Sequence, residues 1–145
     1  MKYAPATYGR TFVLKFDHSD DFYDEIHAFC RKEKISMGTV QFIGAVKSSK
    51  VVVGPENEAL PPEPKWKSFD TPHEVIGFGT IFCLKNEPKV HLHTVFSHDD
   101  GSFIGCIREK TSVFIVIEAI VSELVSDNIS RQYDAETGLN ILTIQ

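Results

Sequence analysis

The sequence predicts an α+β domain in which one main helix covers one face of a strongly curved, mostly antiparallel sheet. Two observations predict this class. Only one stretch has the spacing of an amphipathic helix, whereas nearly all other apolar stretches are short and rich in β-branched residues. A chain of 145 residues with 42% hydrophobic side chains is long enough for one core but short for two. We therefore expect residues 1–145 to form a single domain.

The predicted helix begins near residue 20, where Ser19 or Asp20 can cap its first turn. Acidic residues follow the cap, and basic residues from Arg31 to Lys34 suit the negative end of the helix dipole. Four apolar residues at i, i+4, i+7 and i+8 share one face, which we expect to be buried. These residues are Phe22, Ile26, Phe29 and Cys30.

Short apolar segments on either side of the helix are predicted strands. In chain order they cover residues 11–16, 39–46, 50–53, 75–84, 90–96, 112–124 and 139–144, with turns at 86–88, 98–101 and 134–138. Gly77 and Gly79 lie inside one strand, where glycine allows a close approach or a bulge.

Residues 54–72 contain five of the seven prolines together with several glutamates. This composition predicts an exposed irregular loop or mobile flap. Trp66 lies inside it, and we expect this side chain to pin the loop to the body or to a neighbouring subunit.

The charge balance argues against a free-standing nucleic-acid binder, because such proteins neutralise phosphates with Lys and Arg. The chain has 15 Lys and Arg against 20 Asp and Glu, a formal net charge of −5. Residues 1–50 carry eight basic and six acidic residues, a net of +2, so any basic surface must come from this part. The candidates for nucleic-acid contact are Arg10, Lys47 and Lys50.

The cysteines and the N-terminus predict a cytoplasmic protein. Cys30, Cys83 and Cys106 are odd in number and widely spaced, which favours reduced thiols over a disulfide framework. The first ten residues contain no apolar signal segment, and no run of about 18 apolar residues predicts a membrane span.

The segment His91-Leu92-His93 is the strongest chemical signal, because it lies in a predicted strand. Residues i and i+2 of a strand project to the same face, so both imidazoles can meet one ion while Leu92 points the other way. This geometry suits zinc or another divalent transition metal. The alternative is a pair of polar residues on an exposed or interfacial strand face. The candidates for a third ligand are His98, Cys106, His73 and Glu74.

Glu74 opens the strand that follows the proline-rich loop, next to His73. A carboxylate near a histidine pair could orient a ligating imidazole, bind the metal itself or act as a general base. The alternative is an ordinary charge at the edge of a loop. The sequence contains no nucleophile elbow, phosphate-binding loop or dinucleotide fingerprint, which favours a protein that is not an enzyme.

Several segments, in order, resemble the plants and prokaryotes conserved domain family (PPC or PCC), in its prokaryotic stand-alone form. Each segment is a weak signal alone, but their order and spacing cover nearly the whole chain. They are Gly9-Arg10, the helix from Asp20, residues 37–46, the strand from Glu74, residues 91–97 with Asp100-Gly101, then Gly105, Tyr133-Asp134 and residues 137–142.

The resemblance implies a barrel-like sheet and assembly as a homotrimer. It also implies association with DNA, because plant relatives pair this domain with basic AT-hooks and act in transcription. No hook with an Arg-Gly-Arg-Pro core is present in this sequence, so we expect weak intrinsic DNA affinity.

The resemblance further implies zinc, held in prokaryotic relatives by the histidine pair and a third histidine in a Gly-Gly-His segment. The corresponding segment is Gly105-Cys106-Ile107, so Ile107 replaces the third histidine. Cys106 is adjacent, but along a strand we expect it to face away from the lost position. His91 and His93 would then bind weakly, recruit Glu74 or a residue of another subunit, or only form hydrogen bonds.

Two functional hypotheses follow. The first is a homotrimeric regulatory module that associates with DNA or a regulatory protein. The alternative is a metal-dependent small-molecule enzyme or ligand-binding protein that uses His91 and His93 beneath the loop at 54–72. This alternative draws on a resemblance of the fold to acetolactate decarboxylase, a zinc enzyme.

Overall fold

The computed structural model describes residues 1–99 and 101–145; Asp100, part of the predicted turn at 98–101, lies outside the described residues. In chain order the elements are β1 (Thr7–Asp17), α1 (Phe22–Glu33), β2 (Met37–Pro55), β3 (Pro64–Phe69), β4 (His73–Leu84), β5 (Glu87–His98), β6 (Gly101–Val125), β7 (Ile129–Asp134) and β8 (Leu139–Ile144). The strand pairs between these elements are antiparallel. One helix and an antiparallel sheet confirm the predicted α+β class.

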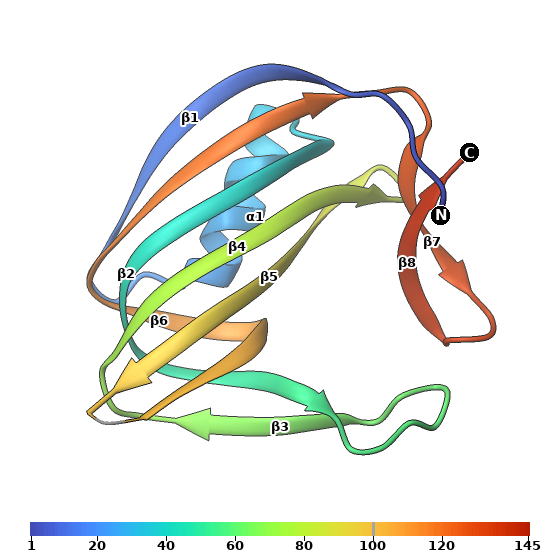
Figure 1. Cartoon of the computed structure of the whole chain (residues 1–145). Coiled ribbons are helices and arrows are strands. Elements are labelled where there is room, and N and C mark those ends of the chain that lie inside the picture. The colour runs from blue at the N-terminus through green and yellow to red at the C-terminus, as the bar shows by residue number, and fades with distance from the viewer. Residues whose placement is uncertain (100) are drawn as a thin grey trace.

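Six strands form the main sheet in the order β1-β6-β5-β4-β2-β3, and β6 also pairs with β2. β6 is 25 residues long, so its first part pairs with β5 and its later part with β1. The strands bend strongly, α1 lies across one face, and β7 and β8 form a hairpin of their own (Figure 1). We call the face covered by α1 the inner face and the opposite one the outer face.

The cap of α1 is Asp21, one residue after the predicted positions. Its carboxylate accepts a hydrogen bond from the backbone N–H of Tyr23 at 3.1 Å. Ser19 instead has a φ of 76°, and Asp20 accepts a hydrogen bond from the N–H of Asp17 at 2.7 Å. The predicted caps therefore belong to the turn that precedes the helix.

The buried stripe of α1 is largely as predicted, since Phe22, Ile26 and Cys30 are 0% exposed. Phe29 is only partly buried and packs edge-on against Phe12, with ring centroids 5.2 Å apart.

Among the described residues no helix is long and apolar enough to cross a membrane.

Two strands differ most in extent from the prediction. β2 is one strand of 19 residues instead of two, because bulges between Gly44 and Val51 interrupt its alternation without ending its pairing with β6. β6 begins at Gly101 instead of residue 112, since the charged residues at 108–110 hide its continuity in the sequence. β7 was not predicted, because it is rich in polar residues and pairs with β8.

The prediction of an irregular loop over 54–72 is wrong for its second half. Residues 64–69 form β3, which pairs with the end of β2 from Pro55 opposite Pro64 to Ser49 opposite Phe69. Proline is tolerated at the first residue of an edge strand, where its missing N–H costs no ladder hydrogen bond. The connection between β2 and β3 is therefore much shorter than the proline content indicates.

The inner face is filled by the hydrophobic core. Phe42 packs against Phe22 of α1, with ring centroids 4.7 Å apart, and Leu92 is 0% exposed. A Cβ added to Gly77 would lie 2.1 Å from the Phe42 ring, and one added to Gly79 would lie 2.5 Å from Leu92. The predicted role of these glycines in close approach is confirmed, and the inner face has no room for a ligand there.

Candidate metal centre

Residues of the outer face form rows across the sheet, because directly opposite residues of antiparallel strands project to the same face. One row is apolar and consists of the successive partners Ile43, Ile76, Val95 and Ile104 on β2, β4, β5 and β6. The next row consists of Gln41, Phe78, His93 and Cys106 on the same strands. His91 follows one step further along β5, opposite Thr80. The sheet therefore places the predicted histidine pair and one cysteine on the same surface.

The three side chains His91, His93 and Cys106 form a compact cluster of donor atoms. The Nε2 atoms of His91 and His93 are 3.1 Å apart. One ligand atom from each of the three residues lies within 4.8 Å of the other two. Tetrahedral zinc holds neighbouring nitrogen and sulfur ligands about 3.3 to 3.6 Å apart, so small side-chain movements would bring all three onto one ion. Two imidazoles and a thiolate are a donor set that suits zinc.

The structure corrects the predicted position of the third ligand. Ile107 pairs with Leu92 and is 2% exposed in the core, so a side chain at this position cannot meet the histidines. Cys106 pairs with His93 and shares its face, contrary to the expectation that it would be badly placed. The β5–β6 register that sets this placement runs from Leu92 opposite Ile107 to His98 opposite Gly101.

The environment of His91 favours its neutral form. Although the ring keeps an exposed edge, burial lowers the pKa of His91 to about 4, and the nearby His93, Arg131 and Arg108 act in the same direction. A neutral imidazole has a free lone pair at pH 7, which is the form that binds a metal ion.

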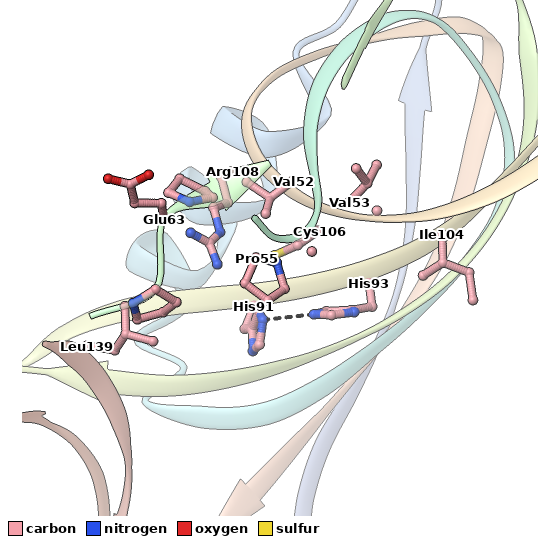
Figure 2. A pocket seen from close by; sticks show the side chains of 14 residues that line it. Val52, Val53, Pro55, Glu63, His91, His93, Ile104, Cys106, Arg108 and Leu139 are labelled. Atoms are coloured by element: carbon pink, nitrogen blue, oxygen red, sulfur yellow. Dashed lines mark hydrogen bonds between the residues drawn. The ribbon is translucent and has the colours of Figure 1, made fainter. Parts of the chain in front are cut away.

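A pocket of about 410 Å³ lies over the cluster, and most of its walls are apolar. His91, His93 and Cys106 line it together with Arg108, which sequence reasoning did not select (Figure 2). The end of β2, the connection to β3 and the start of β8 supply the other walls. Their lining side chains include Val52, Val53, Pro55, Pro62, Pro64 and Leu139. The part of the predicted 54–72 loop that remains irregular, between β2 and β3, therefore contributes to the wall of the pocket.

The other candidate ligands do not join the cluster. His73 is buried at the start of β4, and its ring centroid lies 5.1 Å from that of the exposed His98. Glu74 is exposed and pairs with Ser97, four residues along β5 from His93, which corresponds to about 13 Å. Within one chain, Glu74 therefore cannot orient or bind a metal held by the histidine pair.

The predicted nucleic-acid contacts are separated and occupied by partners. Arg10 donates to Glu123 at 2.9 Å and also pairs with Glu33 at 3.3 Å, near the end of α1. Lys47 donates to the Ser19 hydroxyl at 2.7 Å, just before the start of α1. A helix of 12 residues is about 18 Å long, so these two basic residues lie at opposite ends of it.

Lys50 has two partners of its own. Its Nζ atom lies 3.6 Å from a Glu109 carboxylate oxygen and 4.5 Å from the centroid of the Trp66 ring. Because Arg10 and Lys47 lie near opposite ends of α1, the three residues do not form one basic patch.

The fold and the cluster define a small α+β domain with an open sheet face that carries a histidine and cysteine donor set in a pocket. The chain belongs to the Plants and Prokaryotes Conserved (PCC) domain family, whose sequence profile matches residues 3–125. The match ends with the last residue of β6, before the β7–β8 hairpin. The predicted family is therefore confirmed.

Solved structures share this fold at low sequence identity. A metal-containing protein from Archaeoglobus fulgidus has a TM-score of 0.86 and 23% identity, with 99% of each chain covered. A plant- and prokaryote-conserved (PPC) protein from Pyrococcus horikoshii has a TM-score of 0.86 and 23% identity, with 100% of this chain and 99% of that chain covered. A "putative DNA-binding protein" from Bacteroides thetaiotaomicron has a TM-score of 0.79 and 22% identity, with 96% and 97% covered. No curated protein matches the sequence.

Proposed function

We propose that this PCC-domain protein is a homotrimer that binds a zinc ion, or a similar transition-metal ion, and a small molecule in the pocket on its outer face. One observation carries the proposal: His91, His93 and Cys106 place three donor atoms within 4.8 Å of one another in a pocket of about 410 Å³. Pockets of this size are typical of small-molecule sites. When bound, the metal ion would act as a Lewis acid toward a ligand in the pocket.

His91 and Cys106 have different parts in this proposal. Because its pKa is lowered, the imidazole of His91 is neutral at pH 7 and can bind a metal ion without first losing a proton. Cys106 would supply a thiolate, which softer transition metals prefer. The thiol must stay reduced for this role, which agrees with the cytoplasmic location predicted from the cysteine count.

Metal analysis of protein purified without a histidine tag tests the proposal. We expect about one zinc ion per chain and a higher melting temperature with added zinc, because a ligand that binds only the folded state stabilises it. The double variant His91→Ala/His93→Ala should lose both effects. The variant His98→Ala is the matched control, since it removes an exposed histidine of the same strand outside the cluster. Metal-free protein whose melting temperature ignores zinc would contradict the proposal.

The outer face also supports self-association. Ile43, Ile76 and Ile104 of the apolar row are 54%, 61% and 61% exposed, and Phe78 in the next row is 48% exposed. A contiguous exposed apolar patch favours burial against another protein surface. We assign this surface to further copies of the same chain, because the family resemblance implies a homotrimer and the patch adjoins His93.

The oligomeric state can be measured by light scattering after size-exclusion chromatography. Wild-type protein should have the mass of three chains, and Phe78→Asp should shift the mass toward that of one chain because it buries a charge in the interface. Tyr133→Asp is the control, since Tyr133 is an exposed aromatic residue on β7, in the two-stranded sheet that is separate from the strands of the apolar row. A wild-type monomer, or an unchanged mass for Phe78→Asp, would contradict this assembly.

DNA association is the second candidate function. It is favoured by the description of two structural neighbours as DNA-binding, from Bacteroides thetaiotaomicron and Ralstonia eutropha. Because Arg10, Lys47 and Lys50 already have protein partners, we expect weak binding that disappears as salt rises from about 50 to 200 mM. Fluorescence anisotropy with a labelled duplex measures this affinity. No binding at about 50 mM salt would exclude direct DNA recognition by the chain.

A further inference from the structure

Arg108 is a cationic side chain in the pocket without an acidic partner. It lies two residues after Cys106 on β6 and so projects to the same outer face. It lines the pocket at the end where His91 lies, whereas Val53 and Ile104 lie toward the other end (Figure 2). Among the residues that the structure describes, its guanidinium group forms no ion pair. Glu63 also lines the pocket but is exposed and does not pair with it.

A second guanidinium group approaches the same end of the site from β7. Arg131 is half-buried, and its Nη2 atom donates to the hydroxyl of Thr80 at 3.5 Å. Thr80 is the cross-strand partner of His91, so this contact holds Arg131 beside the cluster. Its Nη1 atom donates to the backbone carbonyl of Asn140 at 3.2 Å. In the described part of the chain, Arg131 has no carboxylate within ion-pair distance.

The charges of this end of the pocket are therefore unbalanced. A divalent ion, one thiolate and two guanidinium groups leave a net positive charge, which an anionic ligand would offset. We propose that the pocket binds a small organic carboxylate whose anionic group is held by Arg108, with Arg131 adding positive charge beside the pocket. This inference rests on the metal site of the proposed function and names the class of molecule that the site takes.

The shape of the pocket selects an organic anion over a small inorganic one. The planar guanidinium group of arginine matches a carboxylate with two parallel hydrogen bonds. The other walls of the pocket include Val52, Val53, Pro55 and Leu139, which offer no donors from their side chains. A carboxylate with a short branched hydrocarbon chain would place its charge at Arg108 and its carbon atoms against these walls.

Isothermal titration calorimetry with isovalerate and isovaleramide tests the inference directly, because the two probes have nearly the same shape and differ in charge. With zinc-loaded protein we expect isovalerate to bind and isovaleramide to bind at least about tenfold more weakly. Inorganic phosphate, titrated separately, should bind more weakly than isovalerate because it gains nothing from the apolar walls.

Variants assign the effect to the two arginines. Arg108→Gln should weaken isovalerate binding about tenfold, and Arg131→Gln should weaken it in the same direction. The control Arg31→Gln should bind like the wild type, because Arg31 lies in the last turn of α1 and outside the pocket. Zinc affinity, measured in each variant by competition with a chelator, should stay within about threefold of the wild-type value.

Each outcome separates the inference from the metal proposal. Zinc binding without a preference for isovalerate over its amide, or with unchanged binding in Arg108→Gln, overturns the inference and leaves the metal site standing. Isovalerate binding that depends on Arg108 in protein that takes up no zinc supports the inference and overturns the metal site. Phosphate binding as tight as isovalerate binding overturns the assignment of the ligand as an organic carboxylate. Loss of both zinc and isovalerate binding in the wild type overturns both.

Discussion

Neighbouring residues of β5 lie in opposite environments. Leu92 is 0% exposed in the core beneath α1, whereas His91 and His93 on either side of it lie on the outer face and reach the pocket. The inner face is covered by a helix of the same chain, but the outer face exposes an apolar row and a set of donor atoms. The comparison indicates that the inner face provides the stability of the fold, while the outer face is left available for ligands and further subunits.

The largest expected effect on stability is that of Leu92→Ala. Removal of a fully buried leucine leaves a cavity, and we expect the free energy of unfolding to fall by about 3 kcal/mol. His91→Ala, one residue earlier but on the outer face, should change it by less than about 1 kcal/mol in metal-free protein. Urea unfolding of both variants measures the contrast. Equal losses would show that the two faces do not divide stability and function in this way.

The next effect concerns the attachment of the helix that covers the inner face. Asp21→Ala removes the cap of α1 and the acceptor of a hydrogen bond from the N–H of Thr111 at 3.2 Å, which joins the helix start to β6. We expect a loss of about 1 kcal/mol in unfolding free energy. Asp70→Ala, at an exposed position after β3, is the control and should be neutral. A loss as small as that of the control would mean that the cap does not stabilise the helix.

The smallest effect is expected at the other end of α1 and depends on pH. Arg10 lowers the pKa of Glu123 to about 2 by hydrogen bonding, so this carboxylate is charged in the folded state well below its usual range. Because the folded pKa lies below the unfolded one, the stabilisation is complete above about pH 4.5 and is lost as the pH falls toward 2.

Arg10→Gln should therefore be less stable than the wild type at pH 7, by less than the loss in Asp21→Ala. The difference between Arg10→Gln and the wild type should shrink between pH 4.5 and pH 3 in urea unfolding experiments. A difference that stays constant with pH would mean that the pair contributes through packing alone.

The parts of the fold that follow simple periodicity could be predicted from the sequence. The stripe of Phe22, Ile26 and Cys30 identified α1, and alternating apolar residues identified most strands. The continuity of β2 could not be read from periodicity, because bulges shift the register near Gly44 and reverse which side chains are buried. β3 was obscured by the prolines around it, which are tolerated at an edge.

In the candidate site, too, some features follow from strand periodicity and others depend on strand register and tertiary packing. The same-face geometry of His91 and His93 follows from a strand period of two and needed no further information. The place of Cys106 depends on the register between β5 and β6, and a register one residue different would have selected Ile107. Arg131 could not be found from the sequence, because it belongs to the separate β7–β8 hairpin and reaches the site only through tertiary packing.

The central claim is that His91, His93 and Cys106 of the outer face bind one metal ion together. Loading the protein with cobalt(II) tests it most directly, because a cysteine thiolate bound to cobalt gives a charge-transfer band in the near ultraviolet. We predict this band at about one cobalt per chain, its loss in Cys106→Ala and its retention in Cys83→Ala, which removes a partly exposed thiol outside the cluster. A cobalt spectrum without the thiolate band, or one unchanged in Cys106→Ala, would contradict the claim.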